Sequence, residues 1–445
     1  AYILMVGRFD NIHPELTCDH AHRILSTPVD QLESQSDLYM AASHLINCPG
    51  ARTEQALMNV LKSSSCAQAV AIAKRKCVEV LARLNCSVAI NVIGQCLDST
   101  DIYLVENSVW ALQQLNCDDP GLISRMLDLL KDQGQNQRVL IQCLAHLKIQ
   151  QAVDSIHTFQ ESEIPGVRGA AISAVAQLTN DASNTFKIAE QLTLPNQMDR
   201  QCAVQDLIDA GASDFLPSIA SAPISPAFRM RAFRQILDSS DLGLLDSKFL
   251  SLIDTVLIDD PSHINIVHEY DQQPGFDFLL GDLFNTDFSR CYLALMGLRE
   301  CPSKDLWPLI EESWEREAHN DYGAHYFFMH LLGSRSDWPL PVFDHVLKII
   351  KESIVNRRPQ FRKSRAAAIQ AFQNLCPDLF IDAFPDFLAE NLDPPWDCRY
   401  ATVMCIDRNS GVDKLMKEEI FNRFIGDSDS FVRARAVKSL ANSTD

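Results

Sequence analysis

Three stretches near the C-terminal end of the chain repeat one pattern: "KSRAAAIQAFQNL" at 363–375, "DCRYATVMCIDRN" at 397–409 and "FVRARAVKSLANS" at 431–443. Each has an arginine at its third position, followed by small residues at helical spacing and then an apolar end. The first arginines of the three stretches lie 34 residues apart. A fixed period of this length is the sequence signature of stacked structural repeats.

The same pattern continues upstream in "GVRGAAISAVAQLTND" (166–181), "MDRQCAVQDLIDAG" (198–211) and "AFRMRAFRQILDSS" (227–240). A second helical stretch lies between successive repeats, as in "LWPLIEESWERE" (306–317), and Pro, Gly, Asn or Asp separates the two. Two helices per repeat predict an all-α protein, an α-solenoid of HEAT-like repeats with a concave ligand groove.

Departures from this rhythm divide the chain. The first residues repeat poorly, and a longer apolar stretch with an acidic turn interrupts the series after residue 240. We predict an N-terminal helical cap at 1–50, a first HEAT-like repeat block at 51–240, an atypical repeat or insertion at 241–286 and a second HEAT-like repeat block at 287–445.

Charge and hydropathy restrict the partners. The formal net charge is −19 over 445 residues, which argues against nucleic acid because phosphate binding needs a basic surface. No apolar run approaches the roughly 18 residues of a membrane span, so we expect neither a secretory signal nor membrane insertion. The prediction is a cytoplasmic protein.

The chain contains 14 cysteines without a single CxxC pair, and many of them lie on apolar helical faces. This usage predicts reduced, buried thiols and no disulfide framework. In "TCDHAH", which contains Cys18, His20 and His22, the two histidines at i and i+2 would diverge on a helix, so we expect a solvated surface and no metal site there or elsewhere.

Aligned repeats predict which side chains share the groove. One column contains aromatic and cationic side chains that could stack on a conjugated ligand or on an apolar patch of a partner. The column consists of Trp110, Gln142, Ser173, Gln205, Arg234 and Phe327.

The richest segment is "NDYGAHYFFMHLLGSR" at 320–335. Tyr322, His325 and Tyr326 recur at i, i+3 and i+4, which places them on one helical face. With Asp321 beside them, this face carries a carboxyl, phenols and an imidazole suited to acid–base work. The alternative is that Tyr326 and Phe328 belong to the core and His325 is a buried, hydrogen-bonded imidazole.

A second pair, Cys143 and His146, is spaced i and i+3 in "QCLAHL". An imidazole at this spacing could activate a thiol nucleophile. The alternative is a packed cysteine with His146 at the groove edge, where the imidazole could contact a ligand.

Four segments resemble the phycobilin lyases of the E/F clan. "FDNIHPELTCDHAHRILSTP" (9–28) and "DLYMAASHLINCPG" (37–50) are similar to their N-terminal region. "SRCYLALMGL" (289–298) and "LWPLIEESWEREAHNDYGAHYFFMHLLG" (306–333) are similar to the second half of single-chain, phycoerythrin-type members. The intervening repeats follow the same plan, so the resemblance spans the chain.

The resemblance implies a bilin lyase that attaches phycoerythrobilin, a linear tetrapyrrole, through a thioether to a cysteine of a phycobiliprotein α-subunit. Phycoerythrobilin would be the substrate, with no metal and no tightly bound cofactor. Some members also isomerise the bilin to phycourobilin. The "NHCQGN" motif of one isomerising branch is absent here, and the resemblance leaves isomerisation open.

Candidate residues follow from the chemistry of such a bilin, which is conjugated, carries pyrrole nitrogens and has two propionates. We predict Asp321 for the pyrrole nitrogens and Tyr322 or His146 for proton transfer. The predicted binding residues are Trp110, His325 and Tyr326 for stacking, Cys143 beside His146, and Arg168, Arg200, Arg231 and Arg234 for the propionates. The alternative functions are a non-catalytic HEAT-repeat scaffold and a bilin carrier or chaperone for phycobilisome assembly.

Overall fold

The computed structural model describes residues 15–238 and 247–444. Within these ranges the chain forms 25 α-helices with short 3₁₀ turns and no strand, which confirms the predicted all-α solenoid. None of the described helices combines the length and the apolar character that a membrane span requires. The chain divides into two compact units, 1–184 and 185–445.

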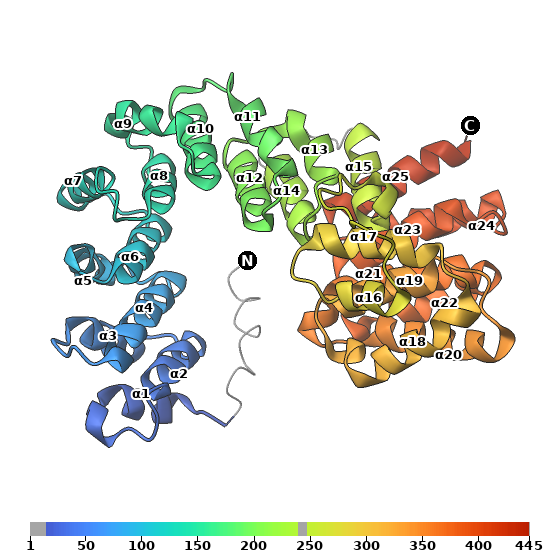
Figure 1. Cartoon of the computed structure of the whole chain (residues 1–445), viewed down its shortest axis with the longest axis horizontal. Helices are drawn as coiled ribbons and strands as arrows, with labels where there is room; N and C mark the ends of the chain where they lie inside the picture. Colours follow the sequence, from blue (N-terminus) through green and yellow to red (C-terminus); the bar gives the residue numbers. More distant parts are fainter. Residues whose placement is uncertain (1–14, 239–246, 445) are drawn as a thin grey trace. The chain divides into compact units, whose positions relative to one another are not determined.

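The first unit is a stack of helix pairs in two layers (Figure 1). Consecutive helices of one layer pack on each other, and each helix of the other layer packs on a helix of the first layer. The first layer consists of α2 (Asp37–His44), α4 (Gln68–Arg83), α6 (Ile102–Gln114), α8 (Gln137–His146) and α10 (Pro165–Thr179), and the second of α1 (Cys18–Ser26), α3 (Ala51–Lys62), α5 (Ile90–Gln95), α7 (Pro120–Leu129) and α9 (Val153–His157).

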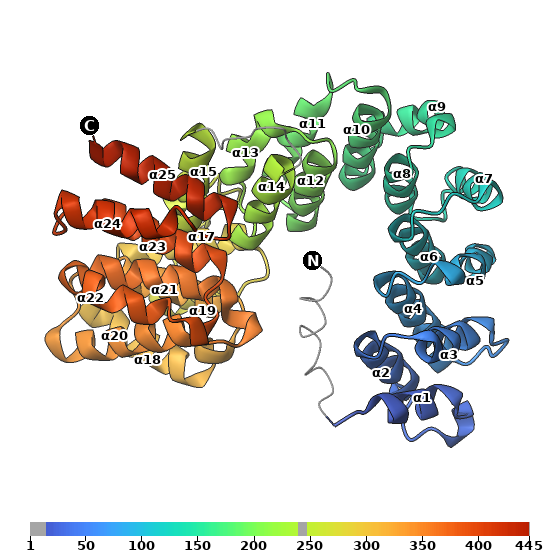
Figure 2. The ribbon, with the colours of Figure 1, turned by 180° about the vertical axis from the view of Figure 1, so that it is seen from behind.

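The second unit begins with α11 (Thr185–Glu190), α12 (Gln197–Asp209), α13 (Leu216–Ala220), α14 (Pro226–Asp238) and α15 (Ser247–Ile258). A row of consecutively packed helices follows (Figure 2). This row consists of α17 (Phe288–Arg299), α19 (Ala324–Gly333), α21 (Arg362–Leu375), α23 (Trp396–Arg408) and α25 (Ser430–Thr444), flanked by α16 (Phe276–Asp282), α18 (Ser303–Arg316), α20 (Leu340–Val355), α22 (Pro377–Phe387) and α24 (Lys414–Phe424).

Helix α15 packs across this row, against α21, α23 and α25. Asp254 of α15 accepts hydrogen bonds from Tyr400 Oη at 2.8 Å and Arg435 Nε at 3.0 Å. At the end of α15, Gln370 Nε2 donates to the carbonyl of Leu257 at 2.7 Å. The described part of the predicted 241–286 segment therefore contributes a helix to the packing of the second unit.

Parts of the predicted segments, residues 1–14 of the cap and 241–246 of the insertion, lie outside the described residues. The boundary between the compact units, after residue 184, falls inside the predicted first repeat block.

Several of the recurring arginines connect their helix to the loop that precedes it. Arg168 Nη1 donates to the carbonyl of Ser162 at 2.6 Å, and Arg433 Nη1 donates to that of Asp427 at 2.7 Å. Arg399 does the same with a preceding loop carbonyl and also pairs with Asp427. These bonds satisfy loop carbonyls beside a helix start, so the repeated arginine has a structural role.

The prediction that all cysteines are reduced is wrong for one pair. Cys18 and Cys48 form a disulfide, with Cα atoms 5.9 Å apart, between the start of α1 and the turn before α3. The two cysteines lie 30 residues apart, so spacing alone gave no signal. The Sγ atoms of this disulfide lie within 4.8 Å of a ring nitrogen of His44. The absence of a metal site stays a prediction.

Gly333 provides a test of the helix packing on which the second unit depends. A Cβ at Gly333 would lie 2.4 Å from Ala371 Cβ and 2.7 Å from its Cα, because α19 and α21 approach closely there. We expect Gly333→Ala to destabilise the fold by about 1–3 kcal/mol in chemical denaturation.

The control is Gly281→Ala in α16, where an added Cβ meets nothing within 4 Å. It should leave stability unchanged or raise it by about 0.4–1 kcal/mol. Equal effects of the two substitutions would contradict the close packing of α19 on α21.

Candidate functional site

A buried ionic network links four helices of the second unit. Arg229 of α14 donates through Nη2 to Asp259 Oδ1 at 2.6 Å and to the hydroxyl of Tyr292 on α17 at 2.7 Å. The hydroxyls of Tyr292 and of Tyr326 on α19 each donate to Asp259 Oδ2 at 2.6 Å. The side chains of Arg229 and Asp259 are fully buried.

Local backbone geometry places these groups. Asp259 directly follows α15 in the left-handed region, with φ of 50°, a conformation that Asp tolerates better than most residues. Arg229 is fixed by two further bonds, to the carbonyls of Ala220 and Ile224. The network therefore joins the α13–α15 part of the unit to α17 and α19.

Burial disfavours the charged form of each of these groups, but Arg229 and Asp259 remain charged because they pair with each other. Burial raises the pKa of Asp259, but the Arg229 guanidinium, His330 and the hydroxyls of Tyr292 and Tyr326 together outweigh burial, and the net shift is downward. Burial and the neighbouring Asp259 carboxylate hold the pKa of Tyr326 well above its usual value. Tyr326 is thus a neutral hydrogen-bond donor to Asp259, and it cannot donate its proton to a ligand.

Most of the aromatic side chains of α19 are core. Tyr326, Phe327 and Phe328 are at most 3% exposed, which confirms the core alternative for Tyr326 and Phe328. Phe327 packs edge-on to Tyr292 with ring centroids 5.3 Å apart. Its predicted place in the groove column is therefore wrong, because the face of α19 that carries Phe327 is covered by α17.

His325 is buried, at 2% exposed, and stacks on Phe361 with centroids 4.3 Å apart. The stacking surface predicted for a ligand is occupied by the protein itself. The Nδ1 atom of His325 has no hydrogen-bond partner among the described residues. Burial lowers the pKa of His325 to about 4, and nearby His319, Arg358 and Lys363 add to this lowering.

Asp321 and Tyr322 lie at the N-terminal end of α19 and remain accessible. Asp321 Oδ1 accepts the backbone N–H groups of Gly323 and Ala324 at 2.9 and 2.7 Å, which caps the helix. Tyr322 is 56% exposed and precedes α19. It therefore does not share the buried face of His325 and Tyr326, contrary to the prediction from helical spacing.

Lys363, in the first turn of α21, connects Tyr322 to the buried network. Its Nζ lies 4.3 Å from the ring centroid of Tyr322, 5.1 Å from that of Phe288 and 5.3 Å from that of Tyr326. This nitrogen has no accessible surface and no hydrogen-bond partner among the residues the structure describes. Burial lowers the pKa of Lys363 to about 8, although nearby Cys291, Asp259 and Asp321 oppose the shift.

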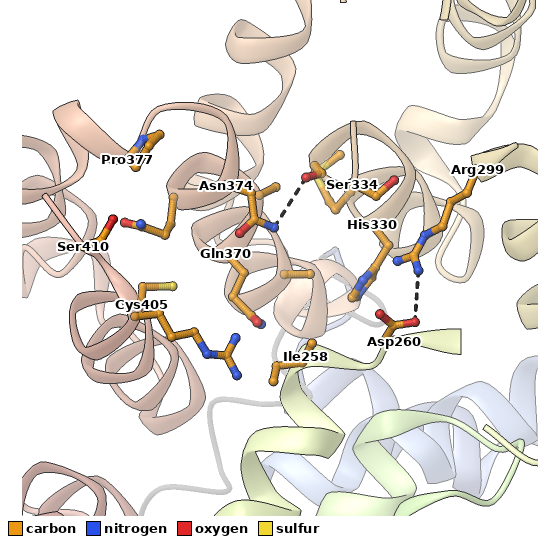
Figure 3. A pocket seen from close by; sticks show the side chains of 16 residues that line it. Ile258, Asp260, Arg299, His330, Ser334, Gln370, Asn374, Pro377, Cys405 and Ser410 are labelled. Carbon is orange, nitrogen blue, oxygen red and sulfur yellow. Dashed lines mark hydrogen bonds and ion pairs between the residues drawn. The ribbon is translucent and has the colours of Figure 1, made fainter. Parts of the chain in front are cut away.

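A cavity in the second unit lies near the C-terminal ends of α19 and α21 (Figure 3). Its volume is about 540 Å³, within the roughly 300–1,000 Å³ of small-molecule sites. Figure 3 shows His330 beside the Arg299–Asp260 ion pair, with Gln370 opposite. Burial lowers the pKa of His330 to about 4, so this imidazole is neutral at pH 7.

Arg408 also lines this cavity and makes no hydrogen bond or ion pair within the described ranges. Together with the amides of Gln370, Gln373 and Asn374 it makes the cavity polar and locally positive. The cavity therefore suits a small polar or anionic group better than a purely apolar one.

Three predicted propionate partners lie in the second unit, and the protein already engages them. Arg200 is fully buried, with Nη1 on two loop carbonyls and Nη2 on Asp287 at 2.5 Å. Arg234 makes two 2.7 Å bonds to Asp429. Arg231 is exposed and donates to Gln205 at 2.6 Å. Arg200 has no donor directed to a ligand, which corrects its predicted role.

The other predicted residues lie in the first unit. Cys143 is fully buried against Met126, and burial raises the pKa of its thiol, which corrects its predicted ligand contact. His146 is exposed at the end of α8, and Trp110 is half-buried on α6. Arg168 is half-buried and bonded to a loop carbonyl. The roles of His146, Trp110 and Arg168 stay predictions.

Sequence reasoning missed Arg229, Asp259 and Lys363. The signal for Lys363 was available in "NRRPQFRKSR" at 356–365, which places five cations and no acid in a chain with a net charge of −19. Asp259 gave no comparable signal, since it is one of 58 acidic residues and lies 30 positions from Arg229.

Replacing Asp259 with Asn should destabilise the protein strongly, because it leaves the Arg229 guanidinium buried without an anion. We expect a loss of about 3–5 kcal/mol in denaturant unfolding. As a control, Asp98→Asn removes the exposed Arg125–Asp98 pair and should not measurably shift the unfolding midpoint. Similar shifts for both variants would show that the buried network adds nothing.

His325 should make stability depend on pH. The unfolded chain protonates this imidazole near its usual pKa of 6.5, but the folded chain does so only near about 4. Between these values the unfolded chain binds more protons, so stability falls as the pH falls.

At pH 4.5, His325 should remove roughly 2 kcal/mol of the stability present at pH 7. His325→Phe keeps an aromatic ring against Phe361 but has no group that can bind this proton. Urea unfolding at both pH values should therefore show a smaller acid loss in the variant. An identical loss would mean that His325 is already protonated in the folded protein.

A comparison with models of protein families finds no match. The chain is 48% identical over 413 residues to the bilin biosynthesis protein CpeY of Synechococcus sp. (strain WH8020), covering 92% of this chain and 98% of that protein. It is 34% identical over 414 residues to the uncharacterized phycocyanin operon protein Y of Pseudanabaena tenuis (strain PCC 7409), covering 91% and 95%.

A shorter match, 26% identical over 182 residues, is to the phycocyanobilin lyase subunit alpha of Picosynechococcus sp. (strain ATCC 27264 / PCC 7002 / PR-6), covering 37% of this chain and 66% of that one. Among solved structures, the CpcE–CpcF complex of phycocyanin lyase from Nostoc sp. PCC7120 matches 55% of this chain and 97% of the compared chain, at 21% identity and a TM-score of 0.48. The two long alignments cover more than nine tenths of this chain. The chain belongs to the phycobilin lyases of the E/F clan.

Proposed function

We propose that this bilin lyase attaches phycoerythrobilin through a thioether to a cysteine of a phycoerythrin α-subunit. The observation that carries the proposal is the 48% identity to a bilin biosynthesis protein over nearly the full length of both chains. The resemblance of the 289–298 and 306–333 segments to single-chain phycoerythrin-type members supports the choice of bilin and acceptor.

The reaction adds a thiol across a double bond. The acceptor sulfur bonds to the ethylidene carbon of ring A, and the proton lost by the thiol is balanced by a proton delivered to the conjugated system. No redox partner is needed. Since the nucleophile belongs to the acceptor protein, the lyase needs to hold the bilin, supply the proton and exclude competing thiols. Orienting the two reactants can contribute about 7–11 kcal/mol in favourable cases.

The accessible N-terminal end of α19 is the proposed place for this chemistry. Tyr322 has an exposed phenol that can donate the proton. Asp321 uses Oδ1 for the helix cap, and its Oδ2 makes no hydrogen bond within the described chain, so it can accept a pyrrole N–H. His146 remains a second candidate for proton transfer. The bilin is proposed as substrate, without a metal or a resident cofactor.

Co-expression tests the proposal. The chain is produced in cells that make phycoerythrobilin, with and without a phycoerythrin α-subunit, and the purified α-subunit is examined by absorption and fluorescence after denaturation. We expect covalent colour on the α-subunit only when this chain is present. Tyr322→Phe, which keeps the ring on Lys363, should lower the initial rate of attachment at least tenfold.

The spectrum distinguishes the remaining possibilities. A product absorbing like unchanged phycoerythrobilin indicates attachment alone, and a blue-shifted phycourobilin band indicates attachment with isomerisation. Colour on this chain but never on the α-subunit would replace the lyase with a bilin carrier. No colour on either protein would leave a scaffold.

A further inference from the structure

We propose that Lys363 is the residue that binds a carboxylate of the bilin, with Tyr322 as the movable cover of its ammonium group. This inference rests on the proposed function, because it takes a propionate-bearing tetrapyrrole as the ligand. It assigns the anion subsite to a residue outside the set of arginines expected from the sequence.

The first support is the isolation of the amine. Lys363 Nζ is enclosed by the rings of Tyr322, Phe288 and Tyr326 and has no hydrogen-bond or ion-pair partner among the residues described. Contact with aromatic faces compensates a buried cation only in part. A lysine buried in this way destabilises the fold, and an anionic ligand would remove this cost by pairing with its ammonium.

The second support is that the nearby carboxylates bond to other groups and not to this ammonium. Both oxygens of Asp259 are occupied by Arg229 and the two tyrosine hydroxyls. Oδ1 of Asp321 is occupied by backbone N–H groups. Asp397, which lines the same small cavity of about 60 Å³ as Lys363, accepts the N–H of Cys398. Within the described residues, no carboxylate therefore bonds directly to this ammonium.

The third support is the charge around it. Lys363 lies in the first turn of α21, next to Arg362 and two residues before Arg365. The N-terminal end of a helix carries a partial positive charge, so cations there are unfavourable and an anion is favourable. Arg365 is bonded to carbonyls of Ile354 and Leu392, and Arg362 is exposed.

Access to the amine is provided by Tyr322. This ring covers Nζ on one side and is 56% exposed. A rotation of the Tyr322 side chain would open the amine toward Asp321, and the flexible four-carbon stem of lysine lets the ammonium follow. One carboxylate would then be held beside the phenol proposed as proton donor.

The test compares phycoerythrobilin with its dimethyl ester, in which both carboxylates are neutral. Dissociation constants of the two bilins are measured by fluorescence titration for the wild-type chain and for Lys363→Met. In the wild type we expect the ester to bind at least tenfold more weakly than the free acid, as for the loss of a charge-assisted bond. In Lys363→Met this ratio should fall by several-fold, because the free acid alone loses affinity.

Thermal unfolding separates binding from folding. Met removes a buried charge and fills the same space, so the Tm of Lys363→Met should equal or exceed that of the wild type. A lowered Tm together with an unchanged ester ratio would show a structural lysine and overturn the proposal. The matched control, Lys351→Met, removes an exposed lysine over Phe372 and should keep the wild-type ratio.

The outcomes also distinguish this inference from the function on which it rests. A wild-type chain that binds neither bilin would contradict the proposed function. Binding with an ester ratio that Lys363→Met leaves intact would overturn only the role of Lys363. If Arg408→Leu removes the ester penalty instead, the carboxylate lies in the larger cavity and the proposal is again overturned.

Discussion

The Arg229–Asp259 ion pair is the interaction on which the second unit depends. It lies where α14 and the end of α15 meet α17 and α19, and two tyrosine hydroxyls complete the coordination of its carboxylate. A buried pair contributes little net stability compared with apolar residues, but breaking it is expensive. Its effect here is geometric, since it fixes the register of α19 and therefore the positions of Asp321 and Tyr322 at the end of that helix.

The repeat architecture could be predicted from the sequence because it depends on local rules. An arginine near each helix start, small residues on the packed face and Pro or Gly between helices predict stacked helix pairs, and the structure has them. Loop carbonyls accept hydrogen bonds from the predicted arginines, as Arg168 and Arg433 show. Some of these arginines were also predicted to bind the ligand, but an arginine bonded to loop carbonyls is no longer available for this role.

The site could be predicted only in part, because it depends on contacts between distant segments. Helical spacing placed Tyr322, His325 and Tyr326 on one face, but α19 begins after Tyr322, so the first is exposed and the other two are buried. The covering of α19 by Phe361 and Phe288 could not be seen in its own sequence. The Cys18–Cys48 bond and the approach of Lys363 to Tyr322 likewise join residues 30 and 41 positions apart.

The proposed ligand is dianionic and the chain is acidic, so its binding needs a locally basic segment, and 356–365 is such a segment. This segment begins α21 beside the accessible end of α19, where the proposed proton donor lies. The most direct test is an experimental structure of the chain with phycoerythrobilin bound. We predict a tetrapyrrole at the N-terminal ends of α19 and α21, with one propionate on Lys363 Nζ and the Tyr322 ring displaced. A tetrapyrrole bound elsewhere, with Lys363 still covered by Tyr322, would contradict this prediction.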